Sequence, residues 1–463
     1  MIQVETRSLK FVADACAGEI RRGSAAALVE NAGTDSRSAK PGDLFFAIRG
    51  EKFDGHEFLD EVAAKGVAAV VVEKKKIPAQ LPDCPVLVVE DARAAFGKLA
   101  AAYRKDFDLP VIAVGGSNGK TTTKELLASV LRQKFSTLWS EASFNNDIGV
   151  PATLLRLKKT HQAAVLEAGT NHPGELAGLI RMIQPKFGVI TNIGREHLEF
   201  FGDVAGVAQE EGWLAELLPA DGKLFINGDN EWTEKIMART RAQVVRVGLG
   251  EKNDWRAKKI RLDKNGVTFQ VDAPQKELSG EYRVNLLGRH QVTNALLALA
   301  VGGELGLDRA ELGDGLAGCQ PPKMRLQFWE ANGVRVLDDA YNANADSTIA
   351  ALETLCDLPL QGRRVAVLGD MGELGAHSGA AHAEVGKRAA ELGIGQLFTV
   401  GKMSAVTAQA ARDAGLTRVI EFSDVEAAMR AVKNFLKPGD VVLLKASRAA
   451  RLERIAETLK ADK

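Results

Sequence analysis

The chain has 463 residues, 46% of them hydrophobic, which is enough for two to four domains with separate cores. Its 60 basic and 60 acidic residues cancel, so the basic excess typical of nucleic-acid-binding proteins is missing. The N-terminus is polar, no apolar run approaches the ~20 residues of a membrane span, and the 4 cysteines are scattered. These features predict a cytoplasmic protein with free thiols, without membrane insertion and without a nucleic-acid partner.

The first segment, residues 1–107, contains apolar runs that predict strands over 67–72 and 86–89. The stretch 91–104 has the spacing of a helix, with Phe96 and Leu99 among its expected core positions. A short break over 105–110 separates this segment from the next one.

The second segment, residues 108–318, opens with a buried-type strand over 111–114, a glycine-rich turn and a helix over 122–135. Further apolar strands are predicted over 163–167, 188–192 and 223–227. Strands that alternate with helices predict a parallel sheet with right-handed crossovers, so this segment has an α/β fold.

The third segment, residues 319–463, repeats the alternation. Strands are predicted over 364–369, 396–400 and 440–445, and helices over 379–392, 404–414, 424–436 and 448–459. The element order is that of a Rossmann-like domain. No GxGxxG follows the first strand, so a dinucleotide is not indicated.

The strongest local signal is the stretch VIAVGGSNGKTTT, which joins the strand over 111–114 to the following helix. Its glycines let backbone N–H groups curl toward phosphate oxygens at a helix N-terminus. Lys120 can reach the β- and γ-phosphates, and the Thr121 hydroxyl can ligate Mg²⁺. Val114 occupies the position where the usual phosphate-loop pattern has its first glycine. The loop predicts a nucleoside triphosphate site formed by Gly116, Ser117, Asn118, Gly119, Lys120, Thr121 and Thr122.

Further motifs resemble the Mur ligase family and its relative folylpolyglutamate synthase across nearly the whole chain. In chain order they are TDSRSAKPGDLFFAIRGEKFDGHEF, SFNNDIGVPATLL, LEAGTNHPGEL, TNIGREHLEFFG, GRHQVTNALLA, LDDAYNANADS, LGDMGELG and LLKASRAARLE. The resemblance implies an N-terminal UDP-substrate domain, a central ATPase-type domain and a C-terminal ligase domain. FNNxIGVP, DDxYNANxDS and LGDMxELG are similar to the family member that adds D-Ala-D-Ala to UDP-N-acetylmuramoyl-tripeptide.

The resemblance also implies two Mg²⁺ ions, which would neutralise charge as phosphate is transferred. Glu167, at the end of an apolar strand, resembles one metal ligand of the family, and His197 resembles the ligand of the second ion. Mur ligases commonly carry a carbamylated lysine fourteen residues after that histidine. Glu211 stands there in this chain, and we expect it to supply the carboxylate directly.

Other residues match motif positions for nucleotide and substrates. Asn294 and Asp339 resemble nucleotide contacts, although Gln291 replaces the first amide of that motif. Arg325 resembles an arginine that reaches the γ-phosphate, and the candidate catalytic residues are Lys120, His197 and Arg325. The expected substrate contacts are Ser36, Arg37, Arg49, Asn145, Asn146, Tyr341, Asn342, Lys445, Ser447 and Arg448.

The expected reaction uses ATP and Mg²⁺ to join UDP-N-acetylmuramoyl-tripeptide to D-Ala-D-Ala through an acyl phosphate, in a protein that we expect to be a monomer. No Ser-His-Asp or Cys-His arrangement is evident, so positioning and charge would carry the catalysis. Three alternatives stay open: another amide ligase of the same family, a regulatory ATPase, and a nucleotide-binding partner protein without turnover.

Overall fold

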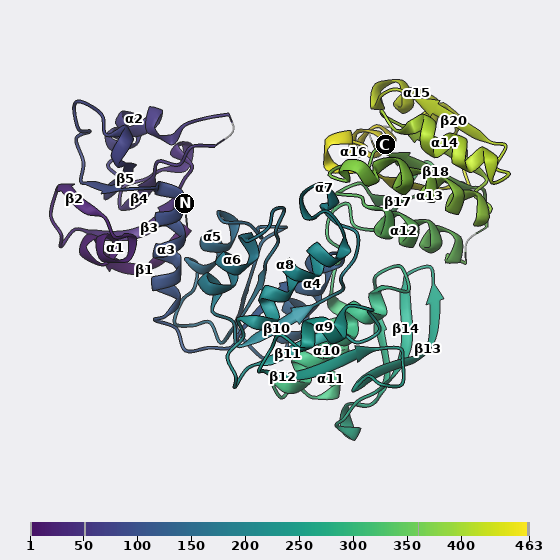
Figure 1. Ribbon diagram of the computed structural model, residues 1–463, viewed down its shortest axis with the longest axis horizontal. Coiled ribbons are helices and arrows are strands. Elements are labelled where there is room, and N and C mark those ends of the chain that lie inside the picture. The colour runs from purple at the N-terminus through teal and green to yellow at the C-terminus, as the bar shows by residue number, and fades with distance from the viewer. Residues whose placement is uncertain (1, 51, 360, 461–463) are drawn as a thin grey trace.

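The computed structural model describes residues 2–50, 52–359 and 361–460. Three domains follow one another along the chain, each built on its own β-sheet (Figure 1). The N-terminal and C-terminal domains flank the central domain and rise from it as separate bodies (Figure 1). The predicted α/β class and the order of three domains are confirmed.

The N-terminal sheet has the strand order β1-β3-β4-β5-β6-β2, with a parallel centre and one antiparallel strand at each edge. Its strands are β1 (Ile2–Ser8), β2 (Glu19–Arg22), β3 (Leu28–Gly33), β4 (Asp43–Phe46), β5 (Ala69–Glu73) and β6 (Val86–Val89). Its helices are α1 (Leu9–Cys16), α2 (Leu59–Ala64) and α3 (Ala92–Arg104), with the 3₁₀ turns η1 (Ser36–Ser38), η2 (Gly55–Phe58) and η3 (Lys74–Lys76).

Helix α3 joins the N-terminal domain to the central one. Asp91 caps its first turn by accepting the N–H of Ala94, and Phe96 and Leu99 are buried as predicted. The Tyr103 hydroxyl donates to the carbonyl of Leu157 at 2.7 Å and accepts the N–H of Glu5 at 2.7 Å. A single apolar cluster runs from the N-terminal sheet through α3 into the central domain, so these two domains share a core.

The central sheet has nine strands in the order β15-β14-β13-β12-β11-β10-β7-β9-β8. The strands are β7 (Val111–Gly115), β8 (Thr137–Trp139), β9 (Ala163–Glu167), β10 (Phe187–Ile190), β11 (Lys223–Asn227), β12 (Gln243–Gly248), β13 (Trp255–Asp263), β14 (Gly266–Asp272) and β15 (Gly280–Val284). The helices are α4 (Lys120–Leu131), α5 (Gly149–Leu154), α6 (Glu175–Ile183), α7 (Leu198–Phe201), α8 (Val204–Glu216), α9 (Thr233–Met237), α10 (Gln291–Glu304) and α11 (Arg309–Gly318), with η4 (Lys276–Leu278).

Strand β7 lies in the middle of this sheet and is buried on both faces. Val111 and Ala113 pack into the cluster shared with the N-terminal domain, while Ile112 and Val114 pack toward α4 and α10. The carboxyl ends of β7, β9 and β10 therefore meet at one edge, which is where parallel α/β sheets bind ligands.

The C-terminal sheet has the order β16-β17-β21-β18-β19-β20 and is parallel except for β16. Its strands are β16 (Gln327–Ala331), β17 (Val334–Asp339), β18 (Arg364–Gly369), β19 (Gln396–Val400), β20 (Val419–Phe422) and β21 (Val441–Lys445). Its helices are α12 (Ala345–Asp357), α13 (Ser378–Glu391), α14 (Ser404–Asp413), α15 (Val425–Phe435) and α16 (Glu453–Lys460), with η5 (Gly375–His377) and η6 (Arg448–Ala450).

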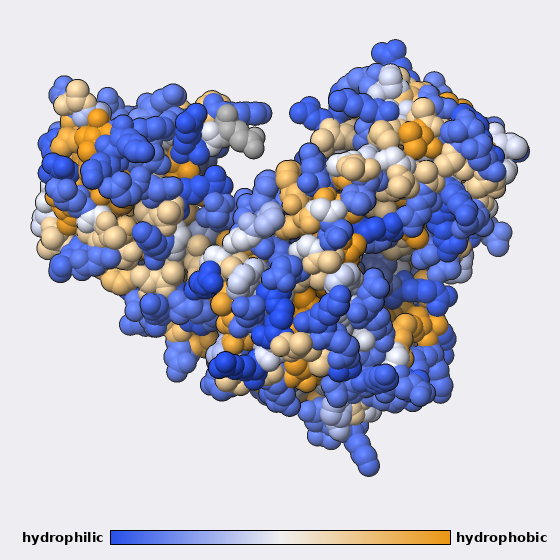
Figure 2. Space-filling model, in the orientation of Figure 1, coloured by the Kyte–Doolittle hydropathy of each residue, from blue (hydrophilic) through white to orange (hydrophobic). Residues whose placement is uncertain are grey.

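The sequence predicted a parallel central sheet, whereas the central and C-terminal sheets are both mixed. Strands β13, β14 and β15 extend the central sheet as antiparallel hairpins, and β16 pairs antiparallel with β17. The visible surface is mainly hydrophilic with scattered apolar groups (Figure 2). None of the helices in the described ranges is both long and apolar enough to span a bilayer.

Candidate active site

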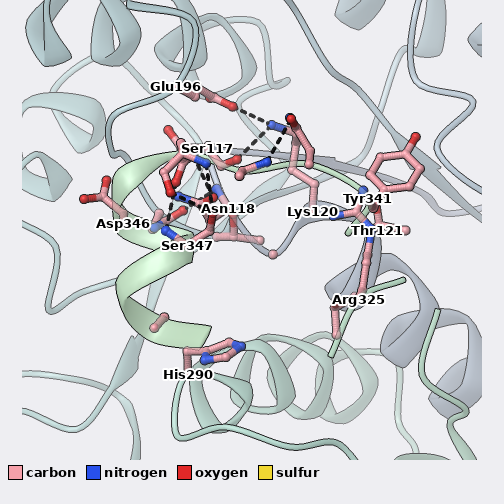
Figure 3. A pocket seen from close by; sticks show the side chains of 18 of the residues that line it. Ser117, Asn118, Lys120, Thr121, Glu196, His290, Arg325, Tyr341, Asp346 and Ser347 are labelled. Atoms are coloured by element: carbon pink, nitrogen blue, oxygen red, sulfur yellow. Dashed lines mark hydrogen bonds and ion pairs between the residues drawn. The ribbon is translucent and has the colours of Figure 1, made fainter. Parts of the chain in front are cut away.

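A cavity of about 400 Å³ lies between the central and C-terminal domains, at the carboxyl edge of the central sheet. The central domain contributes the loop after β7, the first turn of α4 and the segments after β9 and β10. The C-terminal domain contributes the segment after β17, with Tyr341, and the start of α12, with Asp346 and Ser347 (Figure 3). The end of β21 also lines the cavity. Polar and charged side chains from two domains thus converge on one space.

The phosphate loop depends on two glycines with left-handed backbone. Gly116 has a φ of 108° and Gly119 a φ of 86°, and added Cβ atoms would lie 2.5 Å from Thr191 Oγ1 and 2.7 Å from Asn294 Oδ1. The N–H of Ser117 donates to the Asn192 carbonyl at 2.9 Å. Because the N–H groups of Gly116 and Asn118 also have protein acceptors, the donors left for a phosphate are those of the first turn of α4.

Lys120 begins α4 and extends into the cavity, where its ammonium pairs with Glu196 Oε2 at 3.0 Å (Figure 3). It also donates to the carbonyls of Gly116 and Ser117. Burial by itself would lower the pKa of Lys120, but the carboxylates of Glu196 and Glu211 outweigh that effect and raise it. The lysine is therefore a fixed positive charge beside the loop.

Glu167 ends β9 and is almost fully buried. Its Oε1 accepts from Thr121 Oγ1 at 3.1 Å and from Asn145 Nδ2 at 2.8 Å, and its N–H donates to Ser140 Oγ. Its Oε2 is buried without a hydrogen-bond partner. A buried carboxylate oxygen that lacks a partner next to a threonine hydroxyl suits a hard cation such as Mg²⁺.

Glu211 lies behind the phosphate loop and does not line the cavity. It is fully buried on α8, and its Oε2 accepts the N–H of Gly116 at 2.6 Å. Burial raises the pKa of its carboxyl group, and the nearby Lys120 opposes that rise. In this arrangement Glu211 holds the phosphate loop through the N–H of Gly116 and does not face the cavity. Its expected contact with a metal ion stays a prediction.

His197 follows β10 and faces the cavity, with a φ of 47°. Its Nδ1 lies 2.6 Å from Oε2 of Glu373, which belongs to the C-terminal domain. The adjacent imidazole of His197 lowers the pKa of the Glu373 carboxyl group. Among the described residues, no three His, Cys, Asp or Glu side chains form a ready-made metal site. Magnesium would thus need oxygens of the nucleotide and water to complete its coordination.

The C-terminal domain presents five predicted residues to the cavity. The Arg325 guanidinium stacks 4.2 Å from the centre of the Tyr341 ring and donates to Ser143 Oγ at 3.3 Å. Lys445, almost fully buried, pairs with Asp339 Oδ2 at 2.6 Å. These contacts place a planar cation and a buried ammonium opposite the phosphate loop.

Several predicted residues lie away from this cavity. Arg37 pairs with Asp35 in the N-terminal domain, Arg49 is exposed there, and Ser447 is buried with its Oγ accepting the N–H of Gly372. The predicted residues outside the cavity lining are Ser36, Arg37, Arg49, Gly116, Asn146, Glu211, Ser447 and Arg448. Those that line it are Ser117, Asn118, Gly119, Lys120, Thr121, Thr122, Asn145, Glu167, His197, Asn294, Arg325, Asp339, Tyr341, Asn342 and Lys445.

The sequence did not single out Glu196 or Glu373, although both line the cavity and pair with predicted residues. Glu196 directly precedes His197 in the chain, and Glu373 is the glutamate of LGDMGELG, so both stand within quoted motifs. Their partners come from distant segments, which a reading along the chain does not reveal.

Comparison with known proteins gives a consistent family match. The family model described as "Mur ligase middle domain" matches residues 114–302. The one described as "Mur ligase, glutamate ligase domain" matches residues 324–448, and "Mur ligase family, catalytic domain" matches residues 28–104.

Similar proteins match over almost their full length. UDP-N-acetylmuramoyl-tripeptide–D-alanyl-D-alanine ligases from Escherichia coli and Bacillus subtilis are 38% and 33% identical, over 92% and 93% of each chain. A crystal structure of MurF from Acinetobacter baumannii has a TM-score of 0.91 at 32% identity, covering 99% of this chain and 100% of that one. MurF from Thermotoga maritima in complex with ADP has a TM-score of 0.81 at 27% identity, covering 93% and 97%.

Proposed function

Because the chain belongs to the Mur ligase family, we infer that it is an ATP-dependent, ADP-forming ligase that adds D-Ala-D-Ala to UDP-N-acetylmuramoyl-tripeptide. The observation that carries this function is the full-length similarity to ligases named for that reaction. The product is the pentapeptide precursor of the bacterial cell wall.

The reaction has two steps. A carboxylate oxygen of the tripeptide attacks the γ-phosphorus of ATP, the bond to the bridging oxygen breaks, and ADP leaves. The amine of D-Ala-D-Ala then attacks the acyl carbon of the acyl phosphate, loses a proton and displaces inorganic phosphate. Lys120 and Arg325 face the cavity from opposite domains, an arrangement that supports their role in holding the transferred phosphoryl group.

The residues around Glu167 fit a magnesium ion, since an unpartnered buried carboxylate oxygen lies beside the Thr121 hydroxyl. Thr121 and Glu167 would hold one ion, and His197 would hold a second. When bound, magnesium would neutralise phosphate charge during transfer. The protein itself keeps Glu167 in place through Asn145 and Ser140, and it keeps Lys120 charged through Glu196.

We place the binding sites of the two other substrates on the N-terminal and C-terminal domains. The UDP-muramoyl group would bind the N-terminal domain through Ser36, Arg37 and Arg49 and reach the cavity past Asn145 and Asn146. The dipeptide would bind the C-terminal domain, with Tyr341, Asn342, Lys445, Ser447 and Arg448 as candidates. Cavity-lining positions support three of these five. Domain limits at 107/108 and 318/319 remain part of the proposal.

The use of ATP and the free state of all four cysteines support a cytoplasmic location. A monomer is the oligomeric state that we propose, and sedimentation at micromolar concentration would test it.

The decisive experiment measures phosphate release from ATP and Mg²⁺ by the purified protein, with the UDP-tripeptide and D-Ala-D-Ala supplied singly and together. We expect release only with both substrates, together with a product heavier by the dipeptide. A Lys120→Met variant provides the background rate. Release that ignores both substrates would indicate a regulatory ATPase, and release driven by a different amino acid would indicate another ligase of the family.

A further inference from the structure

The segment 194–202, between β10 and α8, carries the candidate metal ligand His197 and is held by the C-terminal domain. Arg195 pairs with Asp346 at 2.6 Å and also with Glu384, both in the C-terminal domain. The carbonyl of Gly202 accepts a hydrogen bond from Nε2 of His377 at 2.8 Å. The segment is thus fixed at its beginning and its end by contacts across the domain boundary.

The contact at the centre of the segment is made by two residues with left-handed backbone. His197 has a φ of 47° and Glu373 a φ of 58°. L-residues with a Cβ rarely adopt this conformation unless the surrounding structure holds them in it, and such residues gather at functional sites. Here the two side chains meet, with Nδ1 of His197 2.6 Å from Oε2 of Glu373, although the alignment is not that of a hydrogen bond and the buried Nδ1 has no hydrogen-bond partner in this arrangement.

The backbone fixes Glu373 in the same place. The N–H of Glu199 donates to the carbonyl of Glu373 at 3.0 Å, and Gly375 packs against Glu199 so closely that an added Cβ would lie 3.1 Å from its Cα. The imidazole of His197 is 15% exposed and Glu373 lies at the cavity lining. The Glu373 side chain is 46% exposed, so the pair differs from a solvated surface ion pair through its constrained backbone and its mostly buried imidazole.

A carboxylate that accepts a hydrogen bond from Nδ1–H determines whether the other ring nitrogen, Nε2, carries a proton. A small rotation of either side chain would let Nδ1–H donate to Glu373, and Nε2 would then carry a lone pair and be free to act as a ligand. Ligand histidines in metal sites characteristically donate their second N–H to a carboxylate, which fixes both tautomer and ring orientation. In this chain the carboxylate comes from a different domain than the histidine.

We propose that Glu373 is the positioning residue for His197, so that docking of the C-terminal domain prepares His197 for its ligand. Opening of the two domains separates the pair and leaves the imidazole free to take the other tautomer. The C-terminal domain thereby controls the phosphate-binding side of the site as well as delivering the second substrate. The inference rests on the proposed function for its catalytic consequence, and on the structure alone for the tautomer.

The test uses the full-length protein and the variant Glu373→Gly, which removes the carboxylate while suiting the left-handed backbone better than glutamate. The chain has 7 histidines, so their imidazole nitrogens can be followed by long-range ¹H–¹⁵N correlation in the metal-free, nucleotide-free protein above pH 8. His197→Gln identifies the His197 signals. We expect the Nδ1–H tautomer in the wild type and mainly the Nε2–H tautomer in Glu373→Gly.

Turnover and metal binding are measured on the same variants. We expect Glu373→Gly to lower kcat by about 10–100-fold and to weaken Mn²⁺ binding by a similar factor. Mn²⁺ binding is measured by electron paramagnetic resonance with ATP present. The change in KM for ATP should be smaller. Glu373→Gln, which can still accept from Nδ1–H through its amide oxygen, should restore most of the Nδ1–H signal. Glu384→Ala removes a neighbouring contact between the same domains and should leave the His197 tautomer unchanged.

Unchanged His197 signals in Glu373→Gly would overturn the proposal, and so would a changed tautomer with wild-type kcat and Mn²⁺ binding. An equal loss of the Nδ1–H signal in Glu384→Ala would show that any contact between the two domains has this effect, and it would also overturn the proposal. If the wild type lacked ligase activity while the tautomers behaved as expected, the proposed function would fail and the positioning contact would stand.

Discussion

Lys124 shows how a buried charge connects the nucleotide loop with the loop that follows β8. It lies on α4, has no exposed surface, and its ammonium donates to the carbonyls of Ser140 and Ala142 at 2.8 and 2.7 Å. Glu125 balances its charge. Since the same loop continues to Asn145, which contacts Glu167, the lysine supports both sides of the site.

Lys124→Met should lower the free energy of unfolding by about 1–3 kcal/mol, because the buried carbonyl of Ser140 and the partly buried carbonyl of Ala142 lose their donor. It should also raise KM for the UDP-tripeptide more than KM for ATP, since the released loop carries Asn145 and Asn146. Urea unfolding and steady-state kinetics measure the two effects. Lys252→Met, at an exposed position, should change neither. Equal changes in both KM values would contradict a selective effect on that loop.

Where one short stretch of sequence carries the expected chemistry, the structure brings its residues together at the cavity. Lys120 and Thr121 line the cavity because strand, glycines and helix follow each other directly in the sequence. Glu211 has the right spacing from His197, yet α8 points it beneath the loop toward the N–H of Gly116. Spacing along the chain does not fix which face of a helix meets a cavity, so this position needed the structure.

At the scale of elements, the buried parallel strands were the most predictable. β9, β11, β18 and β19 have the bounds expected from their short apolar runs. The strands β13 to β15 were missed because their outer halves are solvated, as in WRAKKIRLD, where charged residues break the apolar pattern. Antiparallel hairpins at the edge of a sheet tolerate such residues, so the sequence pattern did not reveal that the central sheet is mixed.

Helix caps at the domain boundary offer a matched pair of variants. Asn344 caps α12 through a reciprocal bond with Ser347, and its Nδ2 also donates to Oδ1 of Asn118 in the phosphate loop at 3.0 Å. Asp308 forms the same kind of capping box on α11, with Glu311. The two caps are alike in kind but differ in their distance from the site.

Asn344→Ala and Asp308→Ala should each destabilise the protein by about 1 kcal/mol, the usual effect of losing a cap. Only Asn344→Ala should also raise KM for ATP, because it alone removes a contact with Asn118. Thermal unfolding and initial-rate measurements separate the two outcomes. A raised KM in both variants would show that general loosening, rather than the contact with the loop, weakens nucleotide binding.

At the scale of the whole molecule, the contact between the central and C-terminal domains is made largely by charged and polar groups. Arg195 forms two ion pairs across this boundary, with Asp346 and with Glu384, and its side chain is 31% exposed. By contrast, the N-terminal domain shares a continuous apolar cluster with the central domain. We therefore expect the C-terminal domain to be the more easily displaced of the two.

Arg195→Ala should weaken docking by about 1 kcal/mol, which corresponds to about a fivefold shift toward separated domains. Small-angle X-ray scattering should show a larger radius of gyration than in the wild type, and added salt should enlarge the wild type in the same direction. Arg239→Ala, which loses a pair with Glu216 inside the central domain, serves as control and should not expand the molecule. An unchanged radius in Arg195→Ala would mean that other contacts hold the domains together.

The separation of the N-terminal domain from the cavity gives the molecule a way to measure length. Arg37 and Arg49 lie outside the cavity lining, on a domain that stands apart from the C-terminal one in Figure 1. In the proposed function, a substrate anchored there by its nucleotide would have to extend its peptide to the phosphate loop to present its terminal carboxylate. Each residue missing from the peptide shortens that reach by about 3.3–3.6 Å. The fixed distance between the N-terminal domain and the phosphate loop would thus exclude substrates with a shorter peptide, and no residue would have to contact the missing part.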